Sequence, residues 1–362
     1  MYDVIIVGAG PAGATLARLL PKTYKILLID KKEISGPADR DSTGKCCGGL
    51  LAPDAQAALS QMSLPLPKSV LVDPQIFAVK AIDLDTENVT FYQRFYINMD
   101  RKKFDNWLLS LLAPNVDVRL NTRFKSYQQK DKNIQVNLIE GDKIYSEDTK
   151  ILIGADGGGS AVRRQTYSSK PAPRQYISIQ HLVESDCLMP YFCSIFDSQI
   201  TDYYCWIIPK ENNLLIGAAL RPHDNPLAKV ELLKTKLKAF NFQIGKTIRK
   251  QSALILRPMH INQIHTGRNG IALIGEAAGW ISPSSAEGLS FAFKSSLILA
   301  EVLTKKLKDF EKDYFRKTLK LRLNILGKNI KSNFIYNPAI RNIIMKTGLN
   351  SLKVHTPEEE KK

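Results

Sequence analysis

The sequence is poor in cysteine and has no long apolar run. Its five cysteines show neither the Cys-x-x-Cys spacing of a zinc site nor a paired disulfide framework, which argues against a metal site and suits a reducing compartment. Glycine, proline and lysine interrupt every apolar stretch before it reaches the roughly eighteen residues of a membrane span. The first apolar strand begins at once and leaves no room for a secretion signal. We therefore expect a cytoplasmic protein without a bound metal.

Acidic side chains are scarce relative to basic ones, and the formal net charge is +16. The excess is concentrated in residues 301–346, where lysine and arginine alternate with large apolar residues at helical spacing. One interpretation is a solvated basic face. The other is attraction to a phosphorylated substrate or to anionic lipid headgroups, which would place the protein on the inner face of the membrane. No nucleic-acid-binding motif accompanies the charge, so we expect no nucleic-acid partner, and the oligomeric state stays open.

The most informative segment is the first thirty residues, which follow the plan of a dinucleotide-binding unit. Residues 4–7 form the short apolar run of a buried parallel strand. A G-x-G-x-x-G turn and a helix start follow, with candidate cofactor contacts at Gly8, Gly10, Pro11, Ala12 and Gly13. The three glycines permit a tight turn, a close approach of a pyrophosphate and close packing of helix on strand. The helix N-terminus adds N–H groups and partial positive charge for the phosphates.

A carboxylate, Asp30, ends the second predicted strand about twenty residues after the glycine turn. An acid in this place accepts hydrogen bonds from both ribose hydroxyls and disfavours a 2′-phosphate, so NADP fits poorly. Lys31 follows as a further candidate contact. Strand, turn, helix and acid together are more specific than the glycine motif alone.

Two later strands also deliver a carboxylate into a glycine turn. Residues 151–153 lead to Asp156 and Gly157, and residues 271–274 lead to Glu276. Each turn alone is compatible with an ordinary strand end. In this order, after the N-terminal unit, the three turns indicate one tightly held nucleotide cofactor.

The three turns resemble the flavoprotein monooxygenase superfamily typified by p-hydroxybenzoate hydroxylase, which carries a G-x-G-x-x-G, a D-G and a G-D motif. Here the last motif reads Gly275-Glu276, with a carboxylate one methylene longer. The resemblance implies FAD as the cofactor, with contacts from Asp156 and Glu276. It also implies that Gly288 and Leu289, at a predicted helix start, offer backbone N–H groups to the flavin N1/O2 edge.

Three more cofactor contacts are implied by this resemblance. Arg101 opens a predicted helix and matches an arginine that such proteins place near the cofactor; the alternative is a solvated helix-start arginine. Gly157 and Gly279 complete the set in the second and third turns. The electron donor stays open between NAD(P)H and ferredoxin or flavodoxin, because the sequence has no second G-x-G-x-x-G.

Two further segments resemble the geranylgeranyl reductase family. KCCGGLLAP, residues 45–53, is similar to the C-G-G-G-L segment of that family, with Leu50 in place of the third glycine. YCWIIP, residues 204–209, is similar to its Y-x-W-x-F-P motif, with Ile208 in place of Phe. The candidate site residues in the two segments are Lys45, Cys47, Gly48, Gly49, Tyr204 and Trp206. Within the family the chain most resembles the CbrA-like bacterial flavoproteins, which share the string LIGEAAG and a basic helical C-terminus.

This resemblance implies reduction of a C=C bond in an isoprenoid or polyprenyl lipid by FADH2, with the lipid or another hydrophobic small molecule in an apolar tunnel. One alkene carbon receives hydride from flavin N5, and an acid must protonate the other. Cys47 is the candidate donor, because a thiol with a pKa of about 8.5 is protonated at pH 7. The alternatives are that Cys47 is only a flavin neighbour or a small loop residue. Tyr204 and Trp206 are expected to line the tunnel or to be ordinary strand core.

Other activities remain open. The first is aromatic hydroxylation through a flavin hydroperoxide. The second is halogenation, because YCWIIP approaches the W-x-W-x-I-P motif of flavin-dependent halogenases, and Lys45 is the nearest candidate for their lysine. The third is a membrane-surface protein that holds FAD without turnover.

The predicted fold is α/β: a discontinuous Rossmann-like FAD-binding domain of the p-hydroxybenzoate hydroxylase type, a mostly antiparallel sheet substrate domain and a helical C-terminus. The expected FAD-binding domain comprises residues 1–74, 99–170 and 259–304. The expected substrate domain comprises residues 75–98 and 171–258. A basic helical region at 305–350 and a disordered tail at 351–362 follow.

Overall fold

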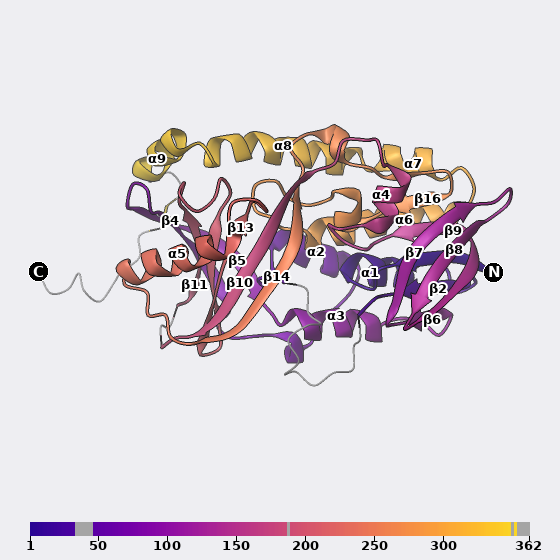
Figure 1. Ribbon diagram of the computed structural model, residues 1–362, viewed down its shortest axis with the longest axis horizontal. Coiled ribbons are helices and arrows are strands. Elements are labelled where there is room, and N and C mark those ends of the chain that lie inside the picture. The colour runs from indigo at the N-terminus through magenta and orange to yellow at the C-terminus, as the bar shows by residue number, and fades with distance from the viewer. Residues whose placement is uncertain (33–45, 187–188, 349–350, 353–362) are drawn as a thin grey trace, which may run out of the picture.

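The structure is a computed structural model that describes residues 1–32, 46–186, 189–348 and 351–352. Lys45, one of the predicted site residues, lies outside the described residues, and so do residues 353–362 of the predicted tail. Two sheets lie side by side along the long axis of the molecule, and the C-terminal helices run past both of them (Figure 1).

The first sheet has a parallel centre in the strand order β16-β9-β1-β2-β6, and β15, β8 and β7 extend it with antiparallel pairing. Its strands are β1 (Tyr2–Val7), β2 (Ile26–Ile29), β6 (Val116–Arg119), β7 (Thr122–Gln129), β8 (Ile134–Glu140), β9 (Lys143–Gly154), β15 (Gly267–Arg268) and β16 (Ile271–Leu273). Helices α1 (Pro11–Leu19) and α6 (Leu289–Lys305) cover one face. The antiparallel strands and Trp280 cover the other, which explains why β1 and β2 are apolar almost throughout.

The second sheet has the strand order β14-β10-β13-β12-β11-β4-β5-β3 and is antiparallel except between β11 and β4. Its strands are β3 (Leu50–Leu51), β4 (Ile76–Asp83), β5 (Asn88–Asn98), β10 (Arg174–Glu184), β11 (Tyr191–Phe196), β12 (Cys205–Lys210), β13 (Asn213–Leu220) and β14 (Thr247–Arg257). Helix α5 (Pro226–Ala239) packs on one face through Val230, Leu233 and Leu237. The opposite face is rich in aromatic side chains and carries Trp206.

The remaining helices connect the sheets or follow them. They are α2 (Pro53–Gln61), α3 (Arg101–Ser110), α4 (Ala161–Thr166), α7 (Glu311–Lys317), α8 (Leu319–Ile335), α9 (Pro338–Thr347) and the 3-10 helices Lys68–Val70, Ile261–Gln263 and Gly275–Ala278. Across the described part of the chain, no helix combines the length and the apolar character needed to cross a membrane. The predicted fold class is confirmed, with two sheets and a helical C-terminus. The domain boundaries stay predictions.

The chain enters the second sheet twice, through β4–β5 and again through β10–β14, and returns to the first sheet each time. The short strand β3 also joins the second sheet, by pairing with the end of β5. The segment before β3, Cys46 to Gly49, therefore leads the chain into the second sheet and packs on Ile208 of β12, and we call this region the junction. This junction and the three glycine turns form the candidate site.

Candidate active site

The first glycine turn is shaped for a ligand at one position and closed by the chain at two others. Gly8 has φ +107, and a Cβ there would lie 2.4 Å from the carbonyl oxygen of Ala155. A Cβ at Gly13 would lie 1.9 Å from the carbonyl oxygen of Gly8. At Gly10 a Cβ would meet no atom within 4 Å. Helix α1 has no side-chain cap and no acid in its first turn, so the space at Gly10 faces a helix N-terminus suited to an anion.

Asp30 ties this turn to the end of β2. Its Oδ2 accepts a hydrogen bond from the N–H of Ala9 at 2.8 Å, and its Oδ1 accepts one from the N–H of Lys32 at 2.9 Å. The side chain is only half-buried, and each carboxylate oxygen can accept a second bond. Asp30 can therefore orient the turn and still accept from ribose hydroxyls. Lys31, beside it, is exposed.

The second turn contains a buried carboxylate oxygen that the described residues leave without a hydrogen-bond partner. Asp156 Oδ2 accepts from the N–H groups of Ala161 at 2.7 Å and Val162 at 3.3 Å, at the start of α4. Asp156 Oδ1 is buried and has no partner among the described residues. Burial raises the pKa of Asp156. Such an oxygen is costly to leave unsatisfied, so a ligand hydroxyl fits it.

The third turn contacts both the second turn and the second sheet. Glu276 is buried, and its Oε1 accepts a hydrogen bond from the N–H of Leu256 at 3.0 Å. A Cβ at Gly158 would lie 3.0 Å from the same Oε1. The Glu276 side chain thus passes next to Gly158 and contacts the backbone of β14. The predicted contact between Glu276 and a flavin cofactor stays a prediction.

Arg163, which the sequence reasoning missed, joins the second and third turns. Its guanidinium donates to the carbonyl oxygens of Glu276, Ala277 and Gly158, at 3.2, 2.9 and 2.6 Å. It is buried, at 5% exposure. The signal that could have identified it is the Arg-Arg pair that follows the second glycine turn.

All three turns meet. The Cβ position of Gly8 lies 2.9 Å from the backbone nitrogen of Asp156, and that of Gly275 lies 2.9 Å from the Cβ of Ala12. Gly157, with φ +76, has no atom within 4 Å of its Cβ position, so a second open position lies in the second turn. Gly279 ends the 3-10 helix of the third turn with φ +91 and packs on Gln263. The arrangement can hold one elongated ligand across the carboxyl ends of β1 and β9.

The start of α6 adds a further helix N-terminus. Gly288 is its N-cap residue and provides no side-chain cap, and Leu289 is buried behind it. Glu287 accepts from the backbone N–H of Ser290 at 2.9 Å and from its hydroxyl at 3.0 Å. The loop before Glu287 is attached to the second sheet, because the hydroxyl of Tyr204 donates to the carbonyl oxygen of Ser285 at 2.7 Å.

The Cys-Gly-Gly segment packs on the Y-x-W-x-F-P-like strand, which the sequence could not show. A Cβ at Gly48 would lie 2.4 Å from Cδ1 of Ile208. Gly49 has φ +64, and its Cβ position lies 2.2 Å from the carbonyl oxygen of Met99. The amide of Gln180 donates to the carbonyl oxygen of Cys47 at 3.2 Å. The two motifs of the geranylgeranyl reductase resemblance therefore form one unit.

Two cations lie beside Cys47. Burial lowers the pKa of Arg101, but Asp105 and a hydrogen bond with Cys47 outweigh it and raise that pKa. The Arg101 Nε donates to Asp105 Oδ1 at 3.0 Å. Lys210 Nζ donates to Asn98 Oδ1 at 2.5 Å, and also to the carbonyl oxygens of Met99 at 3.0 Å and Gly49 at 3.4 Å.

Lys210 is a second residue that the sequence reasoning missed. Burial lowers its pKa to about 8, although the nearby Cys47 acts in the opposite direction. Its position directly after YCWIIP is the signal that could have identified it. A lysine with such a pKa can release a proton near neutral pH.

Aromatic rings line the second sheet next to this segment. Tyr204 and Trp206 have ring centroids 5.5 Å apart, and Tyr203 lies 5.1 Å from Tyr204 and 5.1 Å from Tyr336. Trp206 packs flat on Gly217, where a Cβ would lie 2.5 Å from its ring. Its Nε1 is buried and has no hydrogen-bond partner among the described residues. Tyr204 and Trp206 therefore belong to the buried aromatic cluster of the second sheet, and their predicted place in the wall of a substrate tunnel stays a prediction.

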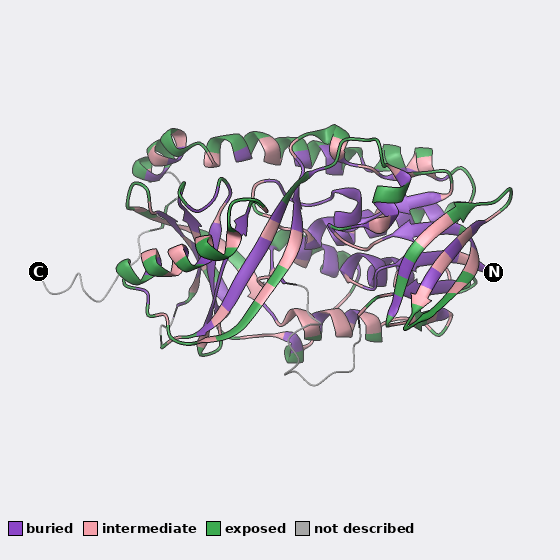
Figure 2. Cartoon of the chain, in the orientation of Figure 1, coloured by how far each residue is buried: buried purple, intermediate pink, exposed green. Residues whose placement is uncertain are grey.

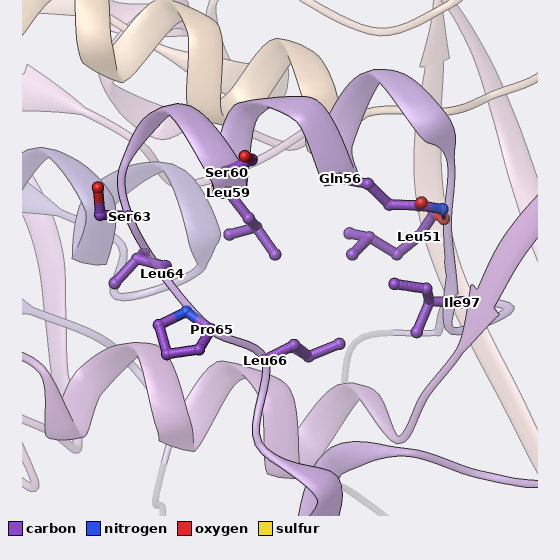
Figure 3. A pocket seen from close by; sticks show the side chains of 9 residues that line it. All are labelled: Leu51, Gln56, Leu59, Ser60, Ser63, Leu64, Pro65, Leu66 and Ile97. Atoms are coloured by element: carbon purple, nitrogen blue, oxygen red, sulfur yellow. Dashed lines mark hydrogen bonds between the residues drawn. The ribbon is translucent and has the colours of Figure 1, made fainter.

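An apolar hollow of about 430 Å³ opens beside β3, between α2 and α3 (Figure 3). Leu51, Leu59, Leu66 and Ile97 point into it, and Gln56 lies at its edge (Figure 3). It begins two residues after Gly49. A hydrophobic molecule would find apolar surface on this side of the junction.

No family model matches the chain. Protein CbrA of Escherichia coli strain K12 is 38% identical over 358 residues, which cover 99% of this chain and 98% of that protein. CbrA of Shigella sonnei strain Ss046 is also 38% identical, with the same coverage. The chain belongs to the CbrA family.

Solved structures share the fold of this CbrA-family chain at low identity. A geranylgeranyl bacteriochlorophyll reductase-like protein of Thermoplasma acidophilum has a TM-score of 0.82 at 18% identity, over 98% of this chain and 93% of that one. PqsL of Pseudomonas aeruginosa, a probable FAD-dependent monooxygenase, has a TM-score of 0.69 at 16% identity, over 96% and 99%. A mutant of halogenase PltM in complex with FAD has a TM-score of 0.69 at 18% identity, over 92% and 76%. The fold of this CbrA-family chain is thus shared by a reductase-like protein, a probable monooxygenase and a halogenase.

In this CbrA-family chain the predicted residues gather in two neighbouring places. The glycine turns with Asp30 and Asp156 form one. Cys47, Arg101 and the aromatic strand form the other. Their roles toward a cofactor stay predictions, and Lys45 lies outside the described residues.

Proposed function

We propose that the chain is an FAD-dependent oxidoreductase that reduces C=C bonds of an isoprenoid lipid. The flavin part rests on Asp156 Oδ1, a buried acceptor without a partner among the described residues at the point where three turns meet. A ribityl hydroxyl would satisfy it. The open positions at Gly10 and Gly157 leave room for the same ligand. The fold shared with PltM in complex with FAD supports this choice.

Different residues of the chain would bind the adenosine ribose, the pyrophosphate and the flavin ring of FAD. Asp30 would hold the adenosine ribose, and the α1 N-terminus at Gly10 would hold the pyrophosphate. The start of α6, at Gly288 and Leu289, would present N–H groups to the flavin ring. When bound and reduced, FAD supplies hydride for the alkene. The electron donor, NAD(P)H or ferredoxin or flavodoxin, is left open in this proposal.

The lipid part rests on the junction between the sheets. The hollow beside β3 offers apolar surface for a prenyl chain, and the buried aromatic cluster of the second sheet packs next to the Cys-Gly-Gly segment. The fold shared with the geranylgeranyl bacteriochlorophyll reductase-like protein of Thermoplasma acidophilum supports the choice of a lipid substrate. An isolated alkene accepts hydride poorly, so the second carbon needs a proton from the protein.

Lys210 is the residue best placed to hold that proton. Among the described residues its Nζ donates to the oxygen atoms of Gly49, Asn98 and Met99, and its pKa of about 8 allows transfer near neutral pH. Cys47 has the side chains of Arg101 and Lys210 beside it, and its carbonyl oxygen accepts a hydrogen bond from the Gln180 amide at 3.2 Å. In this proposal Cys47 has a positioning role beside the flavin, and proton donation by its thiol is the alternative.

Reoxidation of the reduced protein tests the function. Protein loaded with FAD and reduced anaerobically is expected to be reoxidised by polyprenyl diphosphates or their alcohols, with one dihydrogen added per reduced bond by mass spectrometry. If lipids leave it reduced and an aromatic compound accelerates NADPH oxidation under air, the activity is hydroxylation. Products that require halide would establish a halogenase. FAD retained without any turnover would establish a binding protein.

The variant Cys47→Ala distinguishes a positioning role of the thiol beside the flavin from a role as proton donor. Because the variant keeps Lys210, alkene reduction is expected to fall by no more than about tenfold, while FAD stays bound. The measurements are flavin absorbance after gel filtration and the single-turnover rate of reoxidation by lipid. A loss of about 1,000-fold would return the proton-donor role to Cys47.

A further inference from the structure

Helices α7 and α8 carry a continuous row of large apolar side chains on their outer side. We name this row the C-terminal stripe: Phe315, Leu319, Leu323, Leu326, Ile330 and Phe334. Each of the six is between 46% and 56% exposed. Their steps of three or four residues keep them on one helical face. Six such side chains in register form an apolar patch of the kind that marks an interaction surface.

The stripe is not needed to attach α8 to the molecule, because the opposite face of the helix does that. Leu321 and Ile325 are buried in the first-sheet core. Ser332 Oγ accepts a hydrogen bond at 2.8 Å from Arg257 Nη2 at the end of β14. The Tyr336 hydroxyl donates to the carbonyl oxygen of Ser284 at 2.8 Å. In Figures 1 and 2, α8 runs along the upper edge of the molecule with largely exposed residues on its outer side.

Helix α9 is fixed in the same way, so the outer surface is held rigidly. Arg341 Nε donates to Asp83 Oδ2 in β4 at 2.8 Å, and both side chains are buried. Ile343 and Ile344 remain exposed on α9.

The charged residues of α8 and α9 are all basic, and the acids nearest to α8 that form ion pairs with it, Asp54 and Glu287, lie at Lys328. The sequence has no aspartate or glutamate from residue 314 to residue 357. Arg316, Lys320 and Lys331 are exposed and, by helical spacing, lie along one side of the stripe. An occupant must therefore be both apolar and negatively charged. A second copy of this chain meets the first condition and fails the second, because two identical basic faces repel each other.

We propose that the C-terminal stripe docks on an anionic lipid bilayer, with α8 lying in the plane of the membrane surface. The apolar side chains enter the boundary between headgroups and acyl chains, and the flanking lysines and arginine contact the phosphates. This proposal does not depend on the proposed function. If the proposed function also holds, docking brings the end of α8 to the membrane surface. Tyr336 lies at that end and begins the row of aromatic rings that leads through Tyr203 and Tyr204 to Trp206.

Vesicle co-sedimentation of the full chain tests the docking surface. We expect the wild type to bind vesicles of equal parts phosphatidylglycerol and phosphatidylcholine, and to bind pure phosphatidylcholine at least about tenfold more weakly. Leu323→Ser/Ile330→Ser is expected to lose at least about tenfold in binding to the anionic vesicles. The matched control is Leu227→Ser/Ile144→Ser, which removes two exposed apolar side chains elsewhere, at 66% and 57% exposure, and should bind as the wild type does.

A second variant isolates the charges and leaves the stripe intact. Lys320→Gln/Lys331→Gln is expected to bind anionic vesicles about tenfold more weakly than the wild type and with a smaller salt dependence. Unchanged far-UV circular dichroism shows that each variant is folded. Equal binding of the stripe variant and its control would overturn the proposal. So would a wild type that ignores vesicles but forms a dimer that the stripe variant loses. Protein that lacks FAD yet binds vesicles would contradict the proposed function alone.

Discussion

Gly10→Val is expected to weaken FAD binding by at least about 100-fold and to leave the protein folded. The reason is that Gly10 is the one glycine of the first turn whose Cβ position meets no atom of the chain within 4 Å. Its φ of −73 and ψ of −175 suit any L-residue. Valine is a poorer N-cap than glycine, which should cost about 1 kcal/mol of folding free energy. The branched side chain then fills the space that a pyrophosphate needs.

Flavin absorbance after incubation with excess FAD and gel filtration measures the binding, and urea denaturation of the FAD-free protein measures the folding. Gly13→Ala is the matched control, because its added Cβ would lie 1.9 Å from the carbonyl oxygen of Gly8. That variant is expected to lose stability in the FAD-free protein itself. If Gly10→Val holds FAD as tightly as the wild type, the ligand does not cross this turn and the flavin proposal fails.

The parts of the fold that the sequence predicted are those with strong local signals. Parallel strands such as β1 are apolar on both faces and end at glycine turns, so their positions follow from short segments. The alternating residues of β4 and β5 likewise predicted an antiparallel excursion. The convergence of the three turns followed from their order, since parallel strands present their carboxyl ends at the same edge of a sheet.

The parts that could not be predicted depend on contacts between distant segments. Arg163 and Glu276 link the second and third turns to each other and to β14, which no local pattern encodes. Gly48 against Ile208 unites two motifs 160 residues apart. The buried surroundings of Lys210 come from β5 and from the segment before β3, and its lowered pKa exists only in the folded protein. The residues next to Lys210 in the sequence do not distinguish it from an exposed lysine with an ordinary pKa.

The sequence of α8 contains two apolar rows, of which one is buried and the other is exposed. Apolar residues at helical spacing among lysines indicate an amphipathic helix, and Leu321 and Ile325 do form its buried side. The sequence also contains a second apolar row on the opposite side, which is visible as such only once the buried side is known. For this reason the sequence left the basic C-terminus open between a solvated face and attraction to anionic lipid headgroups or a phosphorylated substrate.

Lys210→Met is expected to slow alkene reduction by about 100-fold or more. Methionine has nearly the length of lysine without a proton to give, so the packing around Gly49 is largely kept. FAD binding and the reduction of the flavin by its electron donor should stay within about threefold of the wild type, because neither step needs this proton. The carbonyl oxygen of Met99 and Oδ1 of Asn98 lose a donor, at a cost of about 1–3 kcal/mol of stability. Stopped-flow reoxidation by lipid separates the slowed step from these effects.

The pH profile distinguishes a proton donor from a structural lysine. Donation needs the protonated amine, and its fraction falls about tenfold per pH unit above the pKa of about 8. Wild-type reoxidation by lipid should therefore decline above pH 8, and the decline should vanish in Lys210→Met. Lys210→Arg keeps the charge but holds its proton far more tightly, so it is expected to bind FAD normally and to be as slow as the methionine variant. A fast arginine variant, or an unchanged decline in Lys210→Met, would show that Lys210 only supports the backbone at Gly49 and that the proton comes from another group.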